Sequence, residues 1–197
     1  MDLKAIQQSI EDSTDTGAKS RSLPPVEKWD PEFCGNMNLV IKRNGQWWHE
    51  GTPFTREALV KLFASVIKKE NEDYFLVTPV EKIGITVEDV PFVIIDHKKT
   101  DSGIEVITQT GDRFTLSDAH PVELRKFEES LVPYCNVRRN LWARVHQNVL
   151  YRWVEAAQEV DESASTENTD SNKNKAAKYS KALYLQSGHY RFCIGRF

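Results

Sequence analysis

Apolar and polar residues alternate along the chain with two different periods, which predict both strands and helices. The segments NLVIKR and QWWHE flank Asn44-Gly45. Asn-Gly supplies the two positive-φ residues of a tight turn, so this region is predicted to be a β-hairpin. Apolar residues three and four positions apart over 58–67 then indicate an amphipathic helix, with Thr55 as its cap and an end at 68–70. Three further strands are predicted from Tyr74, Lys82 and Pro91.

A second run with the same order of elements starts after a turn at 98–103. GIEVITQ and RFTLS form a predicted hairpin, and HPVELRKFEESL, with Glu128-Glu129 on a solvated helix face, leads to a strand at PYCNV. Residues 140–159 are predicted to form a long helix, because their apolar side chains fall on one side. ALYLQ and HYRFCIG form a final hairpin around Ser187-Gly188.

The repeated order predicts an internal duplication in an α+β protein. Each unit is expected to hold a mostly antiparallel sheet and one main helix. The predicted organisation is an N-terminal helix and linker over 1–36, one domain over 37–97, and a second over 98–197 with a mobile polar insert at 160–178. Units this small bury little surface alone, so we expect a shared interface, with a ligand in the cleft between them.

Composition and charge narrow the function classes. The chain has 26 Lys and Arg against 29 Asp and Glu, a net charge of −3, which argues against a nucleic-acid binder. The sequence has no run of 18 apolar residues, so no membrane-spanning helix is expected, and its first residues do not have the pattern of an apolar leader. Cys34, Cys135 and Cys193 are few and far apart, so neither a disulfide framework nor a zinc site is expected. We therefore expect a cytoplasmic protein.

Sequence signatures of enzymes and metal sites are missing. The chain contains no GxGxxG, GxxxxGK[ST], GxSxG or HExxH pattern. His49-Glu50 lacks a second histidine four residues on, and Glu88 and Asp89 would point to opposite faces of a strand. No catalytic residue, metal ligand or cofactor is therefore predicted.

Glu81-Lys82 is the first candidate for binding chemistry, at the start of a predicted strand. One interpretation is a solvated surface pair. The other makes Lys82 a cationic ligand for an anion in the cleft, oriented by Glu81.

A second candidate lies at the expected start of the long helix, where Arg138 and Arg139 precede Asn140. Helix N-termini expose unpaired N–H groups, and arginine binds phosphate oxygens bidentately. Positive charge at a helix start is unfavourable by up to about 1 kcal/mol, so something should compensate it. That compensation would come either from an anionic ligand or from carboxylates of the other unit.

Tryptophans are the last candidates. Trp47, Trp48 and Trp142 would serve either as core residues or as stacking platforms for a base. Few basic residues accompany Trp47 and Trp48, which weakens a nucleic-acid platform further.

The runs NGQWWHEGTPFTREALVKLFASVI, YFLVTPVEKIGITVEDVPF and PYCNVRRNLWARV resemble the bacterial family called domain of unknown function 1285. The flanks KWDPEFCGNMNLVI and LQSGHYRFCIG are similar too, so the resemblance covers nearly the whole chain from Trp29. It implies two domains related by duplication, the C-terminal one loosely like a pleckstrin-homology fold. It also implies a nucleotide-like ligand at the domain interface and a part in signal transduction, without an established activity. The insert at 160–178 departs from the family's shorter connection.

The residues that match the family by type are Trp47, Arg56, Glu81, Lys82, Asp89 and Arg138. Together the residues and the resemblance predict a cytoplasmic regulatory or ligand-binding protein. Lys82, Arg138, Arg139 and Arg56 would hold phosphate, and Trp47 would line the pocket. Two alternatives stay open: an enzyme acting on a nucleotide in the same cleft, and a protein-interaction adaptor without a small ligand. No particular protein partner is predicted.

Overall fold

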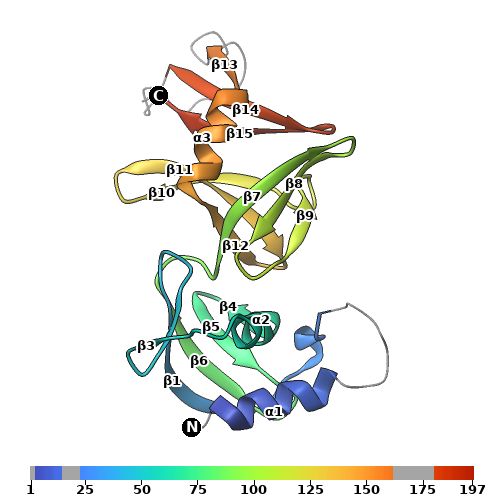
Figure 1. Ribbon diagram of the computed structural model, residues 1–197, viewed down its shortest axis with the longest axis vertical. Helices are drawn as coiled ribbons and strands as arrows, with labels where there is room; N and C mark the ends of the chain where they lie inside the picture. The colour runs from blue at the N-terminus through green and yellow to red at the C-terminus, as the bar shows by residue number, and fades with distance from the viewer. Residues whose placement is uncertain (1–2, 15–22, 162–179) are drawn as a thin grey trace, which may run out of the picture. The chain divides into compact units, whose positions relative to one another are not determined.

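The computed structural model describes residues 3–14, 23–161 and 180–197, and it divides into two units, Met1–Pro91 and Phe92–Phe197 (Figure 1). The division differs from the predicted boundary at 97 and 98. The strand β7 (Phe92–Thr100) spans that boundary and pairs only with strands of the C-terminal unit. Because a strand belongs to the sheet that satisfies its hydrogen bonds, the second unit begins at Phe92.

A six-stranded sheet forms the centre of the N-terminal unit, in the order β3-β2-β1-β6-β5-β4. Its central strands β1 and β6 are parallel, and all its other pairs are antiparallel. The elements of the unit are α1 (Leu3–Thr14), η1 (Val26–Lys28), β1 (Phe33–Ile41), β2 (Trp47–His49), β3 (Thr52–Pro53), α2 (Glu57–Ser65), β4 (Ile67–Glu70), β5 (Asp73–Val77) and β6 (Lys82–Val87).

The C-terminal unit repeats this arrangement with β10-β11-β12-β7-β8-β9. Its first and sixth strands, β7 and β12, are again parallel. A helix and a three-stranded sheet, β13-β14-β15, follow. The elements after β7 are β8 (Gly103–Thr108), β9 (Arg113–Thr115), β10 (Val122–Phe127), β11 (Ser130–Arg138), β12 (Leu141–Val145), α3 (Gln147–Ala156), β13 (Gln158–Asp161), β14 (Lys181–Ser187) and β15 (Tyr190–Arg196).

Both sheets share one strand order, so the predicted α+β duplication is confirmed. In each, the second and third strands lie on one side of the parallel pair, and the fourth and fifth lie on the other. The main helices differ in position: α2 lies between the third and fourth strands, whereas α3 follows the sixth. The predicted likeness of the C-terminal unit to a pleckstrin-homology fold stays a prediction.

The core of each unit forms where apolar faces of sheet and helix meet. In the N-terminal unit, α2 buries Phe63, and the strands bury Leu76 and Ile83. In the C-terminal unit, α3 buries Val149 and Trp153.

The predicted helix at 140–159 is confirmed only over Gln147–Ala156 and is wrong at both ends. Its first part is β12, in which Leu141, Ala143 and Val145 are buried in alternation while the strand pairs with β7 and β11. This two-residue period is typical of a strand, although Leu141 and Val145, four positions apart, also fit a helical stripe. The helix α3 covers only Gln147–Ala156, and β13 follows it.

Smaller expectations also change. Ile67–Glu70 is the strand β4 rather than a helix end, because it pairs with β5. Glu128 and Glu129 form the β10–β11 turn, in which Glu128 has a positive φ. Arg56 rather than Thr55 is at the N-cap of α2. Of the predicted insert at 160–178, residues 160 and 161 belong to β13, and the rest lies outside the described residues.

One buried hydroxyl connects the β14–β15 hairpin to the six-stranded sheet. Ser187 Oγ accepts a hydrogen bond from the Ile104 backbone N–H at 2.8 Å and donates one to the Leu116 carbonyl at 2.7 Å. Gly103 lies against this contact with φ +139°, and a Cβ there would meet Ser187 Oγ at 2.4 Å. A side chain at residue 103 would therefore push the hairpin away from β8.

We predict that Ser187→Ala lowers the free energy of unfolding by about 1–3 kcal/mol, since the buried Ile104 N–H and Leu116 carbonyl lose their hydroxyl partner. Urea denaturation measures the change. Ser180→Ala is the control, because Ser180 is exposed. Equal midpoints for the two variants would show that the hydroxyl contact contributes no net stability.

Candidate functional site

A pocket of about 220 Å³ lies in the C-terminal unit beside α3, and we call it the α3 pocket. Its walls come from β7, β8, α3, β13, β14 and β15. The lining residues are His97, Lys99, Ile104, Trp153, Ala156, Gln158, Tyr184, Leu185, Gln186 and Arg191.

Strand geometry explains why these residues meet. His97 and Lys99 are two positions apart on β7, so their side chains leave the same face. Tyr184 and Gln186 have the same spacing on β14, and Gln186 is the cross-strand partner of Arg191 on β15. The pocket therefore depends on the register of two separate sheets.

The charge of the α3 pocket is one-sided. Lys99 and Arg191 line it, and among the described residues no Asp or Glu does. Neither cation forms an ion pair with a described carboxylate. The Arg191 guanidinium lies 4.3 Å above the Tyr184 ring, which fixes its position without neutralising it. The arrangement suits an anion.

Trp153 forms the apolar wall and is 1% exposed. The edges of His97 and Phe192 lie against it, with ring centroids at 6.1 and 5.7 Å. Trp153 Nε1 and His97 Nδ1 are both buried and lack a hydrogen-bond partner among the described residues. Unpaired buried polar atoms are uncommon in native proteins, so these two mark an unusual local environment.

Burial lowers the pKa of His97, and the nearby Arg152 lowers it further, whereas Asp96 opposes them. Asp96 is itself held at 2.7 Å by Arg152 across β7 and α3. The lowered pKa favours the neutral form of His97.

The predicted ligand residue Lys82 lies in another pocket, of about 410 Å³, in the N-terminal unit. Its ammonium is paired with Glu70 and lies 4.8 Å above the Phe75 ring. Glu70, which the sequence prediction missed, also binds Lys68 at 3.2 Å. The partner that orients Lys82 is thus Glu70, not Glu81, whose Oε2 atom is buried without a described hydrogen-bond partner. The full lining is Phe33, Asn36, Asp73, Tyr74, Phe75, Lys82, Gly84 and Ile85.

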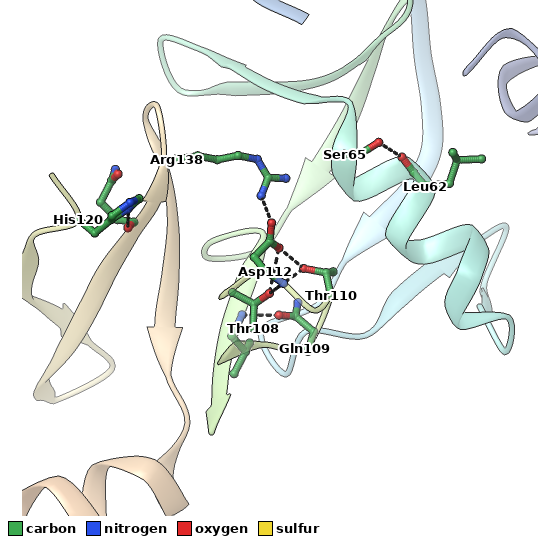
Figure 2. A network of polar contacts seen from close by, with 10 residues as sticks. Leu62, Ser65, Thr108, Gln109, Thr110, Asp112, His120 and Arg138 are labelled. Atoms are coloured by element: carbon green, nitrogen blue, oxygen red, sulfur yellow. Dashed lines mark hydrogen bonds and ion pairs between the residues drawn. The ribbon is translucent and has the colours of Figure 1, made fainter. Parts of the chain in front are cut away.

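Arg138 does not precede a helix, so the helix-start argument for it is wrong. It is the last residue of β11, and Arg139 is exposed in the turn to β12 with φ 53°. Figure 2 shows the Arg138 guanidinium directed at Asp112, which also accepts hydrogen bonds from the Thr108 and Thr110 hydroxyls at 2.9 and 2.7 Å. The compensating carboxylate therefore comes from the same unit.

The remaining candidates lie on different elements. Arg56 is exposed at the start of α2. Trp47 is 2% exposed in β2, within the core of the N-terminal unit. Lys82 belongs to the N-terminal unit and Arg138 to the C-terminal unit, so their grouping at one ligand stays a prediction.

The sequence prediction missed the residues of the α3 pocket because they come from three distant segments, around 97–104, 153–158 and 184–191. Alternation on β7 and β14 was the available signal. It places side chains on a common face within one strand, but it does not say which faces meet.

Two family models match this chain, one for each unit. The N-terminal domain of the family named domain of unknown function DUF1285 matches residues 24–90, and its C-terminal domain matches 91–173. The chain belongs to the DUF1285 family. The predicted resemblance is confirmed, and with it the two-domain organisation of the family. Tyr184, Gln186 and Arg191 lie beyond the matched residues, so part of the α3 pocket falls outside the family match.

Two solved structures of the DUF1285 family are similar to this chain. A protein from Silicibacter pomeroyi DSS-3 is 28% identical with a TM-score of 0.77, over 99% of this chain and 95% of that one. A protein from Shewanella baltica OS155 is 30% identical with a TM-score of 0.50, over 60% of this chain and 91% of that one. No curated protein matches.

Two further observations concern the described residues alone. None of their helices has the length and apolar character to cross a membrane. No group of three or more His, Cys, Asp or Glu side chains among them is placed to hold a metal ion.

We predict that Arg138→Met lowers the free energy of unfolding by about 3 kcal/mol, because Asp112 then loses its arginine in a largely buried network. The matched control is Arg139→Met at the exposed neighbour, with an expected change within about 0.5 kcal/mol. Urea denaturation of both variants measures the difference. Similar losses would mean that the Asp112 contact adds no stability of its own.

The lowered pKa of His97 predicts a pH dependence of stability. The folded state binds the proton less readily than the unfolded state, so stability should fall as the pH drops through the ordinary value of 6.5. Chemical denaturation between about pH 7.5 and 5.5 should show this decrease in the wild type and a smaller one in His97→Gln. Carboxylates with a lowered pKa, such as Glu70, take up protons mainly below pH 4.5, so they do not affect the stability in this pH range. If the free energy of unfolding of His97→Gln fell with pH as steeply as that of the wild type, the pH dependence would come from other groups. His189→Gln is the control, because His189 is exposed.

Proposed function

We propose that this protein binds a small phosphate-bearing anion and that the α3 pocket is the binding site. The observation that carries the proposal is the lining itself: two cations and an imidazole, with no described carboxylate among them. A concave site that keeps its positive charge attracts an anion from solution.

Lys99 and Arg191 come from different sheets, β7 and β15, and therefore reach the pocket from different walls. Arginine offers a planar fork of donors that matches phosphate oxygens, and lysine adds a compact charge. His97 supplies a third group that becomes cationic when an anion favours its protonated form. The three groups together suit a phosphate with several oxygens.

The proposal keeps the anionic ligand predicted from the sequence and moves its site. Lys82 and Arg138 already have carboxylate partners, Glu70 and Asp112, whereas Lys99 and Arg191 have none among the described residues. A cation that already has a counter-charge has less to offer a ligand, because the ligand must displace that partner. A regulatory role, with part in signal transduction, fits a binding protein of this kind and stays a prediction, as does the cytoplasmic location.

The test is calorimetric titration of the full chain with inorganic phosphate and pyrophosphate. We predict that Lys99→Ala and Arg191→Ala each weaken binding by about tenfold or more, since each removes a charge-assisted hydrogen bond. Lys98→Ala is the matched control, because it removes the same charge from the next residue of β7, whose side chain leaves the opposite face.

Arg191→Lys separates charge from packing, since it keeps the charge and loses the guanidinium that covers Tyr184. Intermediate affinity in this variant would support direct binding. No binding of either anion, or equal losses in the Lys98 and Lys99 variants, would contradict the proposed function. If neither anion binds, a pull-down would test the adaptor alternative. If an anion binds, an assay for turnover of a bound nucleotide would test the enzyme alternative.

A further inference from the structure

The aromatic rings of the α3 pocket offer little surface for stacking. Trp153 is 1% exposed and is enclosed by the edges of His97 and Phe192. One face of Tyr184 is covered by the Arg191 guanidinium. A nucleobase gains its affinity by stacking on an open aromatic face, which contributes about 1–3 kcal/mol per base. The pocket therefore has the charge for a phosphate without the platform for a base.

Its carboxamides suit hydroxyl groups. Gln186 uses its Nε2 to donate to the Gly188 carbonyl at 2.8 Å, which leaves its Oε1 as an acceptor. The Gln158 side chain forms no hydrogen bond with the described residues, so both its donor and its acceptor remain for a ligand. A hydroxyl group both donates and accepts, as a carboxamide does, so the two glutamines match adjacent hydroxyls of a ligand.

The size of the pocket points the same way. Its volume of about 220 Å³ lies below the range of roughly 300–1,000 Å³ in which pockets enclose drug-sized ligands. The Lys82 pocket of the N-terminal unit shows the opposite combination. It is larger and includes Phe33, which is 55% exposed, but its lysine is already paired with Glu70. Unneutralised cations and an open aromatic ring thus occur in different pockets.

We propose that the ligand of the α3 pocket is a phosphorylated, polyhydroxylated, non-aromatic compound of about the size of a sugar phosphate. This inference rests on the proposed anion site and narrows its ligand class. The phosphate binds Lys99 and Arg191, and the hydroxyl groups bind Gln158 and Gln186. It replaces the nucleotide-like ligand that the family resemblance implied.

The test compares ribose 5-phosphate, AMP and inorganic phosphate by calorimetry on the full chain. The first two share a phosphorylated ribose and differ by the base. We expect ribose 5-phosphate to bind about tenfold more tightly than inorganic phosphate, because two hydroxyl–amide hydrogen bonds are added. AMP should bind no more tightly than ribose 5-phosphate.

Variants of the glutamines separate this inference from the proposed function. We expect Gln158→Ala and Gln186→Ala to weaken the binding of ribose 5-phosphate severalfold and to leave the affinity for inorganic phosphate unchanged. Gln46→Ala in the N-terminal unit is the control. The sugar-phosphate inference would be overturned if AMP bound more tightly than ribose 5-phosphate, or if ribose 5-phosphate and inorganic phosphate bound with equal affinity. The proposed anion site would stand in both cases. Failure of all three to bind would overturn the proposed function itself.

Discussion

The parallel pairing of the first and last strands of each sheet is the constraint on which the rest of the structure depends. It joins β1 to β6 and β7 to β12 at the centre, so the hairpins between them must extend to opposite sides. In the C-terminal unit the pairing continues beyond β12, where the His146 backbone N–H donates to the Ile94 carbonyl at 3.0 Å. His146 is the N-cap of α3, so the helix starts beside β7 and carries Trp153 to His97. The α3 pocket is a result of this geometry.

Counter-charges then divide the basic residues into two groups. Arg138, with a side chain 11% exposed, and Lys82, 19% exposed, both have carboxylates because a charge removed from water is costly without one. Lys99 and Arg191 are exposed to solvent. Lys82 and Arg138, which stand out in the sequence, therefore have carboxylate partners in the fold, whereas Lys99 and Arg191 have none among the described residues.

Local patterns were sufficient for most of the fold. Asn44-Gly45 and Ser187-Gly188 each turn a hairpin, and the repeated order of elements identified the duplication. The first part of the long helix was predicted wrongly because Leu141 and Val145 satisfy both a helical and a strand period, and pairing with β7 decides between them. The site was harder to predict, since carboxylates 12 and 26 residues away along the chain neutralise Lys82 and Arg138. Sequence neighbours do not reveal such partners.

The β14–β15 hairpin supplies Tyr184, Leu185, Gln186 and Arg191 to the α3 pocket, while β7 and α3 supply the opposite wall. A ligand held by both walls joins the hairpin to the duplicated sheet, in addition to the contacts of Ser187. Binding energy would then oppose local opening of the hairpin, which would otherwise expose Phe192 and Ile194. The last two strands would thus report occupancy through the rate at which their amide hydrogens exchange, while the β1–β6 sheet would exchange as before.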